Sequence, residues 1–156
     1  MKALESTSSV LANIVLPVTD GALLVPNAAV AEVTIAGGLS SAIASSFMLG
    51  MLMWREQEIP VFSFEGLRDG ELPKNLKIRH VAVLHGIGNR AALPFFAVAL
   101  SGMPHIERLI SADVEPLEAQ TQPLIHSVVR VGEQRMMIPD WDYMEQQIMA
   151  ALATAV

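Results

Sequence analysis

Residues 50–64, GMLMWREQEIPVFSF, contain the clearest structural pattern in the chain. Two apolar runs, 51–54 and 59–64, lie on either side of the polar tetrapeptide Arg55-Glu56-Gln57-Glu58. Short apolar runs that flank a brief polar connection are typical of a β-hairpin. The stretch therefore predicts two antiparallel strands, with Arg55 and its polar neighbours at the tip.

The same arrangement occurs three more times along the chain. The paired runs are 10–18 with 22–25 around Asp20-Gly21, 78–85 with 93–100 around the 86–90 loop, and 127–131 with 136–138 around residues 132–134. Four hairpins at this spacing predict an all-β barrel or a pair of barrels. Between them, Asn27 is expected to cap a helical turn through Glu32, and residues 67–77 and 114–123 are expected to be solvated loops.

One helix is expected, at the C-terminus. Asp142 and Glu145 stand three residues apart, the spacing at which two side chains satisfy the free amides of a helix start reciprocally. Met144, Ile148 and Leu152 follow at four-residue steps, which places them on one helix face. The expected fold is therefore all-β with a C-terminal helix.

Composition excludes several classes of protein. The 156 residues are 52% hydrophobic and carry a net charge of −6, which argues against a disordered chain and against a nucleic-acid partner. The chain has no cysteine, so thiol chemistry is excluded. Residues 33–54 are uncharged up to Trp54, but glycines and serines interrupt them, so we expect a buried segment without membrane insertion. The N-terminus makes a poor signal peptide, and the expected location is cytoplasmic.

No catalytic, cofactor-binding or metal-binding site is predicted from the residues. The four histidines have no spacing that suits a metal pair. Residues 86–91, GIGNRA, fit a dinucleotide-binding pattern, but that pattern requires a helix next, and the Phe95–Ala97 region favours a strand. A glycine turn within a hairpin is the favoured interpretation. A small β-barrel enzyme or a ligand- or nucleotide-binding protein that uses the Gly86–Arg90 loop and His85 remains the alternative function.

The 50–64 stretch resembles a signature of the CheW-like domain, in which an apolar strand, an arginine-centred turn, a proline and a second strand follow a glycine. Residues 21–33 are similar to the opening of that family, with a strand, Pro26, a short helix and an acidic residue. Residues 95–116 and 125–148 are similar to its later strands, acidic loop and closing helix, so the resemblance spans about residues 10–148. Three features depart from it: Glu56 stands where the family usually has glycine, Ser63 stands where it often has aspartate, and Pro139 displaces Asp140 from the acidic position after the last strand.

The resemblance implies a single domain over residues 8–156, made of two intertwined five-stranded, SH3-like β-barrels packed side by side. It implies a non-catalytic adaptor that couples the cytoplasmic tip of a chemoreceptor to a CheA-type histidine kinase. The groove between the barrels would receive the receptor, and the protein would associate peripherally with receptor arrays in the cytoplasm. The departures suggest a divergent member, belonging to a type IV pilus or surface-motility chemosensory system.

The expected partner-binding residues are Met53, Trp54, Arg55 and Glu56. Tryptophan and arginine are enriched among the residues that dominate interface energies, and a guanidinium binds a carboxylate through two parallel hydrogen bonds. Two alternatives remain open at this point. Arg55 could be neutralised locally by Glu56 or Glu58, and the methionines at 51 and 53 could be core filler.

Overall fold

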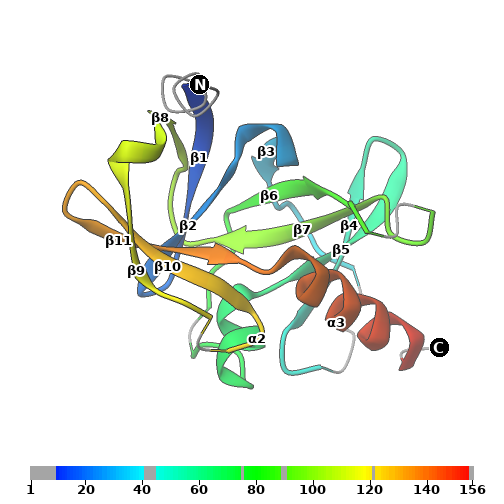
Figure 1. Cartoon of the computed structure of the whole chain (residues 1–156). Coiled ribbons are helices and arrows are strands. Elements are labelled where there is room, and N and C mark those ends of the chain that lie inside the picture. The colour runs from blue at the N-terminus through cyan, green and yellow to red at the C-terminus, as the bar shows by residue number, and fades with distance from the viewer. Residues whose placement is uncertain (1–9, 41–44, 75, 89–90, 121, 155–156) are drawn as a thin grey trace.

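The computed structural model describes residues 10–40, 45–74, 76–88, 91–120 and 122–154. Their strands form two sheets, and the two helices α2 (Phe64–Asp69) and α3 (Trp141–Thr154) lie against them (Figure 1). The six-stranded sheet has the order β8-β1-β2-β11-β10-β9, with bounds β1 Leu11–Val18, β2 Gly21–Pro26, β8 His105–Leu109, β9 Val114–Glu118, β10 Ile125–Val131 and β11 Gln134–Pro139. The five-stranded sheet has the order β3-β6-β7-β5-β4, with bounds β3 Val30–Ile35, β4 Met48–Trp54, β5 Gln57–Phe62, β6 His80–His85 and β7 Phe95–Leu100.

The four predicted hairpins are confirmed as β1–β2, β4–β5, β6–β7 and β10–β11. Two parallel pairings between distant segments complete the sheets: β2 with β11, and β5 with β7. The prediction of a mostly β protein with a C-terminal helix is therefore confirmed. The strand counts are six and five, and the pairing of the described strands shows no closed barrel.

Three segments differ from the sequence-based expectation. The helical turn at Asn27 is a 3₁₀ turn, Asn27–Ala29, that ends early, and Glu32 lies in strand β3. The expected loop 67–77 begins inside α2, which Ser63 caps by accepting a hydrogen bond from the Gly66 amide at 3.0 Å. The expected connection 114–123 contains β9, an edge strand that tolerates Pro116 because its outer side pairs with no other strand.

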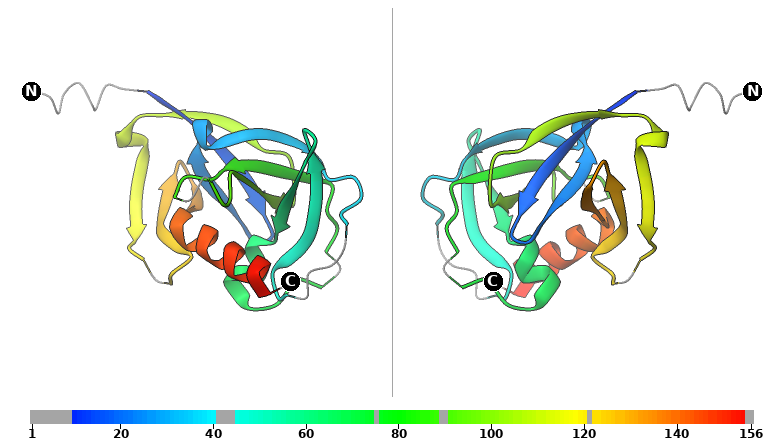
Figure 2. Two further views of the ribbon diagram at one scale, coloured as in Figure 1. Left: turned by 90° about the vertical axis from the view of Figure 1, so that its right-hand side faces the viewer. Right: turned by 90° about the vertical axis from the view of Figure 1, so that its left-hand side faces the viewer.

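The central strands of the five-stranded sheet are apolar on both faces because each face packs on a different core. In β6, Val81 and Val83 pack into a cluster enclosed by the five-stranded sheet, with Leu52 and Ile59. The alternate residues, including Leu84, belong to the central cluster, which contains residues of both sheets and of α3. A third cluster consists of residues of the six-stranded sheet. The views in Figure 2 show the two sheets side by side, with α3 next to both.

The edges of the five-stranded sheet approach each other although they do not share a ladder. Beyond β3, Ser40 forms an isolated bridge with Met51 of β4, with N–O distances of 2.9 and 3.1 Å. The sheet therefore curls strongly enough to bring β3, one edge strand, close to β4, the other. This curling positions the side chains of the candidate site.

The C-terminal helix is confirmed, but its cap differs from the prediction. Helix α3 begins at Trp141, and Asp140 caps it by accepting a hydrogen bond from the Tyr143 amide at 3.0 Å. The predicted pair Asp142–Glu145 forms no capping box, because the Glu145 carboxylate instead accepts hydrogen bonds from the 86–88 loop. The apolar face was predicted correctly, since Met144 and Ile148 are buried in the central core.

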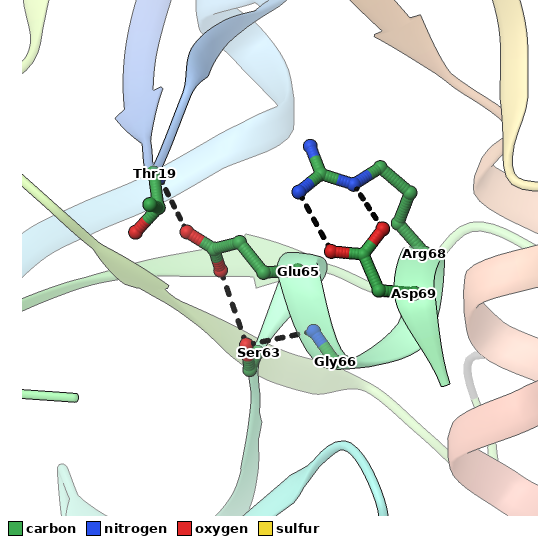
Figure 3. A network of polar contacts seen from close by, with 6 residues as sticks. All are labelled: Thr19, Ser63, Glu65, Gly66, Arg68 and Asp69. Atoms are coloured by element: carbon green, nitrogen blue, oxygen red, sulfur yellow. Dashed lines mark hydrogen bonds and ion pairs between the residues drawn. The ribbon is translucent and has the colours of Figure 1, made fainter. Parts of the chain in front are cut away.

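A buried carboxylate joins the two halves of the molecule. Glu65, at the start of α2, accepts hydrogen bonds from the Thr19 amide in the β1–β2 turn and from the Ser63 hydroxyl (Figure 3). Ser63, where the family often has aspartate, is itself buried and holds both the helix start and this carboxylate. At the other end of α2, the hydrogen-bonded Arg68 guanidinium lowers the pKa of the Asp69 carboxyl below its ordinary value.

Residues 33–54, the long uncharged run, hold the end of β3 and the whole of β4 in their described part. Across the described ranges of the chain, no helix combines the length and the apolar composition needed to cross a bilayer. The expectation that this run would not form a membrane helix agrees with its strand structure.

Candidate partner-binding site

A tight two-residue turn at the tip of the β4–β5 hairpin presents the predicted residues. Trp54 pairs with Gln57 in the ladder, so Arg55 and Glu56 alone form the connection. Their φ angles are 48° and 65°, the left-handed pair that a type I′ turn requires. Glycine meets this requirement without strain, and its replacement by Glu56 is therefore a local cost in this chain.

Glu32 of β3 connects Trp54, the last residue of β4, with Arg55 of the turn. One oxygen of its carboxylate, Oε1, accepts a hydrogen bond from Trp54 Nε1 and another from Arg55 Nη2, each at 3.1 Å. The Arg55 guanidinium carbon also lies 4.4 Å from the centre of the Trp54 ring, within cation–π range. Arg55 is thus paired locally, as one alternative anticipated, but with a glutamate 23 residues earlier and not with Glu56 or Glu58.

The four predicted residues differ in exposure. Trp54 is only 6% exposed and packs edge-on against Phe95, with ring centres 4.8 Å apart. Met53 is 65% exposed, and 64% of the Arg55 side chain is exposed. Glu56 is also exposed. The surface offered at the tip therefore consists of Met53, Arg55 and Glu56, with Trp54 beneath Arg55 as its support.

The methionines divide between core and surface. Met48 is buried in the central core, whereas Met51 is half-buried and Met53 lies in solvent on the outward face of β4. The core-filler alternative is thus wrong for Met53, and Met51 is only partly buried. Sequence reasoning also missed Glu32 as a site residue; the acidic residue in the 21–33 stretch was the signal that pointed to it.

Comparisons with known proteins identify the family and the fold. The sequence pattern of the CheW-like domain matches residues 14–147, well over half of the chain. The chain belongs to the CheW-like domain family. Its fold is similar to the crystal structure of the scaffolding protein TtCheW from Thermoanaerobacter tengcongensis, with a TM-score of 0.67, 13% identity and 85% of each chain covered. No curated protein matches the chain with significance.

In this CheW-like domain, the main-chain amides of the 86–88 loop are hydrogen-bonded within the protein. Glu145 of α3 is 3% exposed, and its carboxylate accepts hydrogen bonds from the amides of Ile87 at 2.6 Å and Gly88 at 3.1 Å. A nucleotide phosphate would have to displace this buried carboxylate to reach the same donors. Two residues of the predicted loop, Asn89 and Arg90, lie outside the described residues.

Close packing explains the glycines of the same loop. A Cβ atom at Gly86 would stand 1.8 Å from the Leu93 carbonyl oxygen, and one at Gly88 would stand 3.1 Å from Glu145 Oε1. His85, also named in the alternative, is half-buried beside Phe95, with ring centres 5.3 Å apart. In the described part of the CheW-like domain, no three His, Cys, Asp or Glu residues are placed to hold a metal ion.

Proposed function

We propose that this protein is a non-catalytic adaptor that couples chemoreceptors to a CheA-type histidine kinase. The observation that carries the proposal is the match to the CheW-like domain over residues 14–147, together with the two-sheet fold shared with a CheW scaffolding protein. A scaffold needs a surface that is complementary to its partners, and it needs no reactive pocket. The exposed tip of the β4–β5 hairpin meets that need.

The tip is suited to binding because its arginine is held in place while its donors face solvent. Glu32 engages one nitrogen of Arg55, and Trp54 lies against the guanidinium plane. A held guanidinium loses less conformational entropy on binding than a free one. Because the Glu32 pair is largely exposed, it contributes less than about 1 kcal/mol and a partner carboxylate can compete for the remaining donors.

We infer that Met53, Arg55 and Glu56 contact the partner directly and that Trp54 acts by supporting Arg55. The methionine thioether adapts to varied helix faces, such as those of a receptor's helical tip. Arginine and glutamate side by side match a partner surface with charges of both signs. These roles belong to the proposal and are tested with it.

Titration of the purified chain against a chemoreceptor cytoplasmic fragment and a CheA-type kinase fragment tests the function. Arg55→Glu should weaken binding of at least one fragment by about 2 kcal/mol, roughly 30-fold, through charge reversal at the contact. Arg55→Lys should recover part of the loss, since an ammonium lacks the planar fork. The thermal midpoint should change little, because the residue is exposed.

Arg130→Glu is the matched control, since Arg130 is an exposed arginine of the other sheet that also pairs with a glutamate. It should leave both affinities unchanged. If the parent chain bound neither fragment, the adaptor function would be wrong. If the parent bound and Arg55→Glu bound equally well, Arg55 would lie outside the interface while the function stood.

The proposal includes the finer features expected of the family. Residues 8–156 would work as one unit of two barrel-like subdomains, which the central core shared by both sheets supports. The protein would act in the cytoplasm, at receptor arrays. The departures at Glu56 and Ser63 favour a chemosensory system for pilus-driven motility, and loss of twitching on deletion of the gene would support that assignment.

A further inference from the structure

Three exposed cations, Lys74, Lys77 and Arg79, follow one another between α2 and β6. Their charged side-chain groups make no ion pair or hydrogen bond with any described residue. By contrast, each of the four arginines that form ion pairs has a carboxylate within reach: these are Arg55, Arg68, Arg130 and Arg135. Lys74 shares a hollow with Asp20, Asp69 and Glu71, so Lys77 and Arg79 are the cations of this segment that stand apart from carboxylates, on a molecule whose net charge is −6.

These cations line three hollows that adjoin one another. The first is lined by Lys74 and Lys77 and shares Lys77, Leu100 and Ser101 with the second. The second shares Arg79 and His80 with the third. Among the described residues, no carboxylate lines the second or third hollow. Glu65 in the first is buried and accepts hydrogen bonds from Thr19 and Ser63, and an acidic hollow with Asp20, Asp69 and Glu71 adjoins it at Lys74. We call this continuous surface the basic furrow.

In the basic furrow, the cationic side chains stand at alternate positions, and an apolar side chain lies at each end. Lys77 and Arg79 are exposed whereas Ile78 and His80 are half-buried, the alternation of an extended chain. Two cations on one face of an extended chain stand about 7 Å apart, the spacing of alternate residues in an extended partner. Two largely exposed apolar side chains flank them, Ile35 at 70% in the third hollow and Met103 at 65% in the second.

We propose that the basic furrow binds an extended acidic segment of a partner protein. The segment would carry carboxylates at alternate positions, opposite Lys77 and Arg79, and apolar residues toward Ile35 and Met103. Charge complementarity selects an acidic occupant. The hollows favour a peptide over a membrane, because side chains fill hollows and a flat layer of lipid headgroups does not. The inference concerns a surface other than the hairpin tip and does not rest on the proposed adaptor function.

Amide chemical shifts of the labelled full chain test the proposal. The probe is a seven-residue peptide of alternating glutamate and serine with leucine at both ends, compared with the same peptide carrying glutamine for glutamate. The acidic peptide should give saturable shifts at Gly37, Ile78 and Gly102, and none at Arg55. Lys77→Glu with Arg79→Glu should weaken its binding at least tenfold, and higher salt should weaken binding to the parent chain.

Arg130→Glu with Arg135→Glu is the matched control, because both double variants change the net charge from −6 to −10, two units at each of two positions. The control should alter the peptide affinity less than twofold. Equal binding of the glutamine peptide, equal losses in the two double variants, or no saturable shift would each overturn the proposal. Binding to phosphatidylserine vesicles that depends on Lys77 and Arg79, with no binding of the peptide, would overturn it in favour of a membrane surface.

Discussion

Two connections of the five-stranded sheet are each held by a distant glutamate, with opposite results. At the β4–β5 tip, Glu32 binds side chains, Trp54 and Arg55, and leaves the tip exposed. In the β6–β7 loop, Glu145 binds main-chain amides and is itself buried. The Glu32 carboxylate orients side chains at an exposed tip, whereas the Glu145 carboxylate binds amide donors that a ligand could otherwise use.

The difference shows why the glycine-rich loop is a misleading motif in this chain. The main-chain amides of a glycine-rich loop can bind a phosphate only when no protein group already accepts their hydrogen bonds. Here a carboxylate from α3 supplies the anion, and Gly86 allows close contact with the Leu93 carbonyl. A short turn of charged residues, in contrast, becomes a candidate site because its side chains are oriented and exposed.

Removing a fully buried ring of the central core should have the largest effect, because it destabilises the whole fold that carries both connections. Phe62 is fully buried in the central core, with its ring centre 6.1 Å from that of Phe96. Phe62→Ala should leave a cavity and lower the free energy of unfolding by about 3–5 kcal/mol. Urea unfolding measures the loss, and amide exchange should accelerate at both connections. A variant as stable as the parent would contradict the observed burial.

Removing the buried Glu145 carboxylate should have the next largest effect, and it should affect the β6–β7 loop and not the β4–β5 tip. Glu145→Ala should lower the free energy of unfolding by about 2–3 kcal/mol, because the Ile87 and Gly88 amides lose a charged acceptor. Glu145→Gln keeps one acceptor oxygen and should cost less. Urea unfolding is the measurement, and receptor and kinase affinity should stay unchanged.

Glu133→Ala is the control for that experiment, because Glu133 lies exposed in the β10–β11 turn. It should leave stability within about 0.5 kcal/mol of the parent. A Glu145→Ala protein that bound nucleotide, and bound it more tightly than the parent, would reopen the alternative function for the loop.

The hairpins could be predicted from sequence because each consists of two apolar runs, near each other in the chain, on either side of a polar or glycine-containing connection. Strand β9 could not, since Pro116 and its glutamates are typical of loops, and only pairing with β10 makes the segment a strand. Helix α2 could not be predicted because it is short and contains Gly66. Glycine is needed there because a Cβ atom would stand 2.6 Å from the Ser46 carbonyl oxygen. The predicted site lacked Glu32 because the contact depends on the curl of the sheet, which no local pattern encodes.

Removing the exposed carboxylate should affect binding more than stability. Glu32→Ala should lower partner affinity about fivefold, because Arg55 and Trp54 lose the group that holds them, while unfolding changes by less than about 1 kcal/mol. Titration against the receptor and kinase fragments measures the loss. Glu58→Ala is the matched control, since Glu58 is a nearby exposed residue of β5 and should have no effect. If Glu32→Ala bound like the parent while Arg55→Glu did not, Arg55 would need no positioning.

The smallest effect should come from the turn itself. Glu56 holds a φ of 65°, which costs a residue with a side chain about 1–2 kcal/mol relative to glycine. The greater conformational freedom of glycine in the unfolded chain lowers the free energy of unfolding by about 0.5–1 kcal/mol, which offsets part of this strain relief. Glu56→Gly should therefore raise the free energy of unfolding by about 0.5 kcal/mol net, measured in urea.

Glu56→Gln separates the strain at this position from its charge, because glutamine keeps the side chain in the left-handed turn and removes only the carboxylate. It should have the stability of the parent. If both variants lose partner affinity equally, the Glu56 carboxylate contacts the partner. If only Glu56→Gly loses it, the rigidity of the turn is what the partner requires. A destabilised Glu56→Gly variant would show that the strain is compensated within the hairpin.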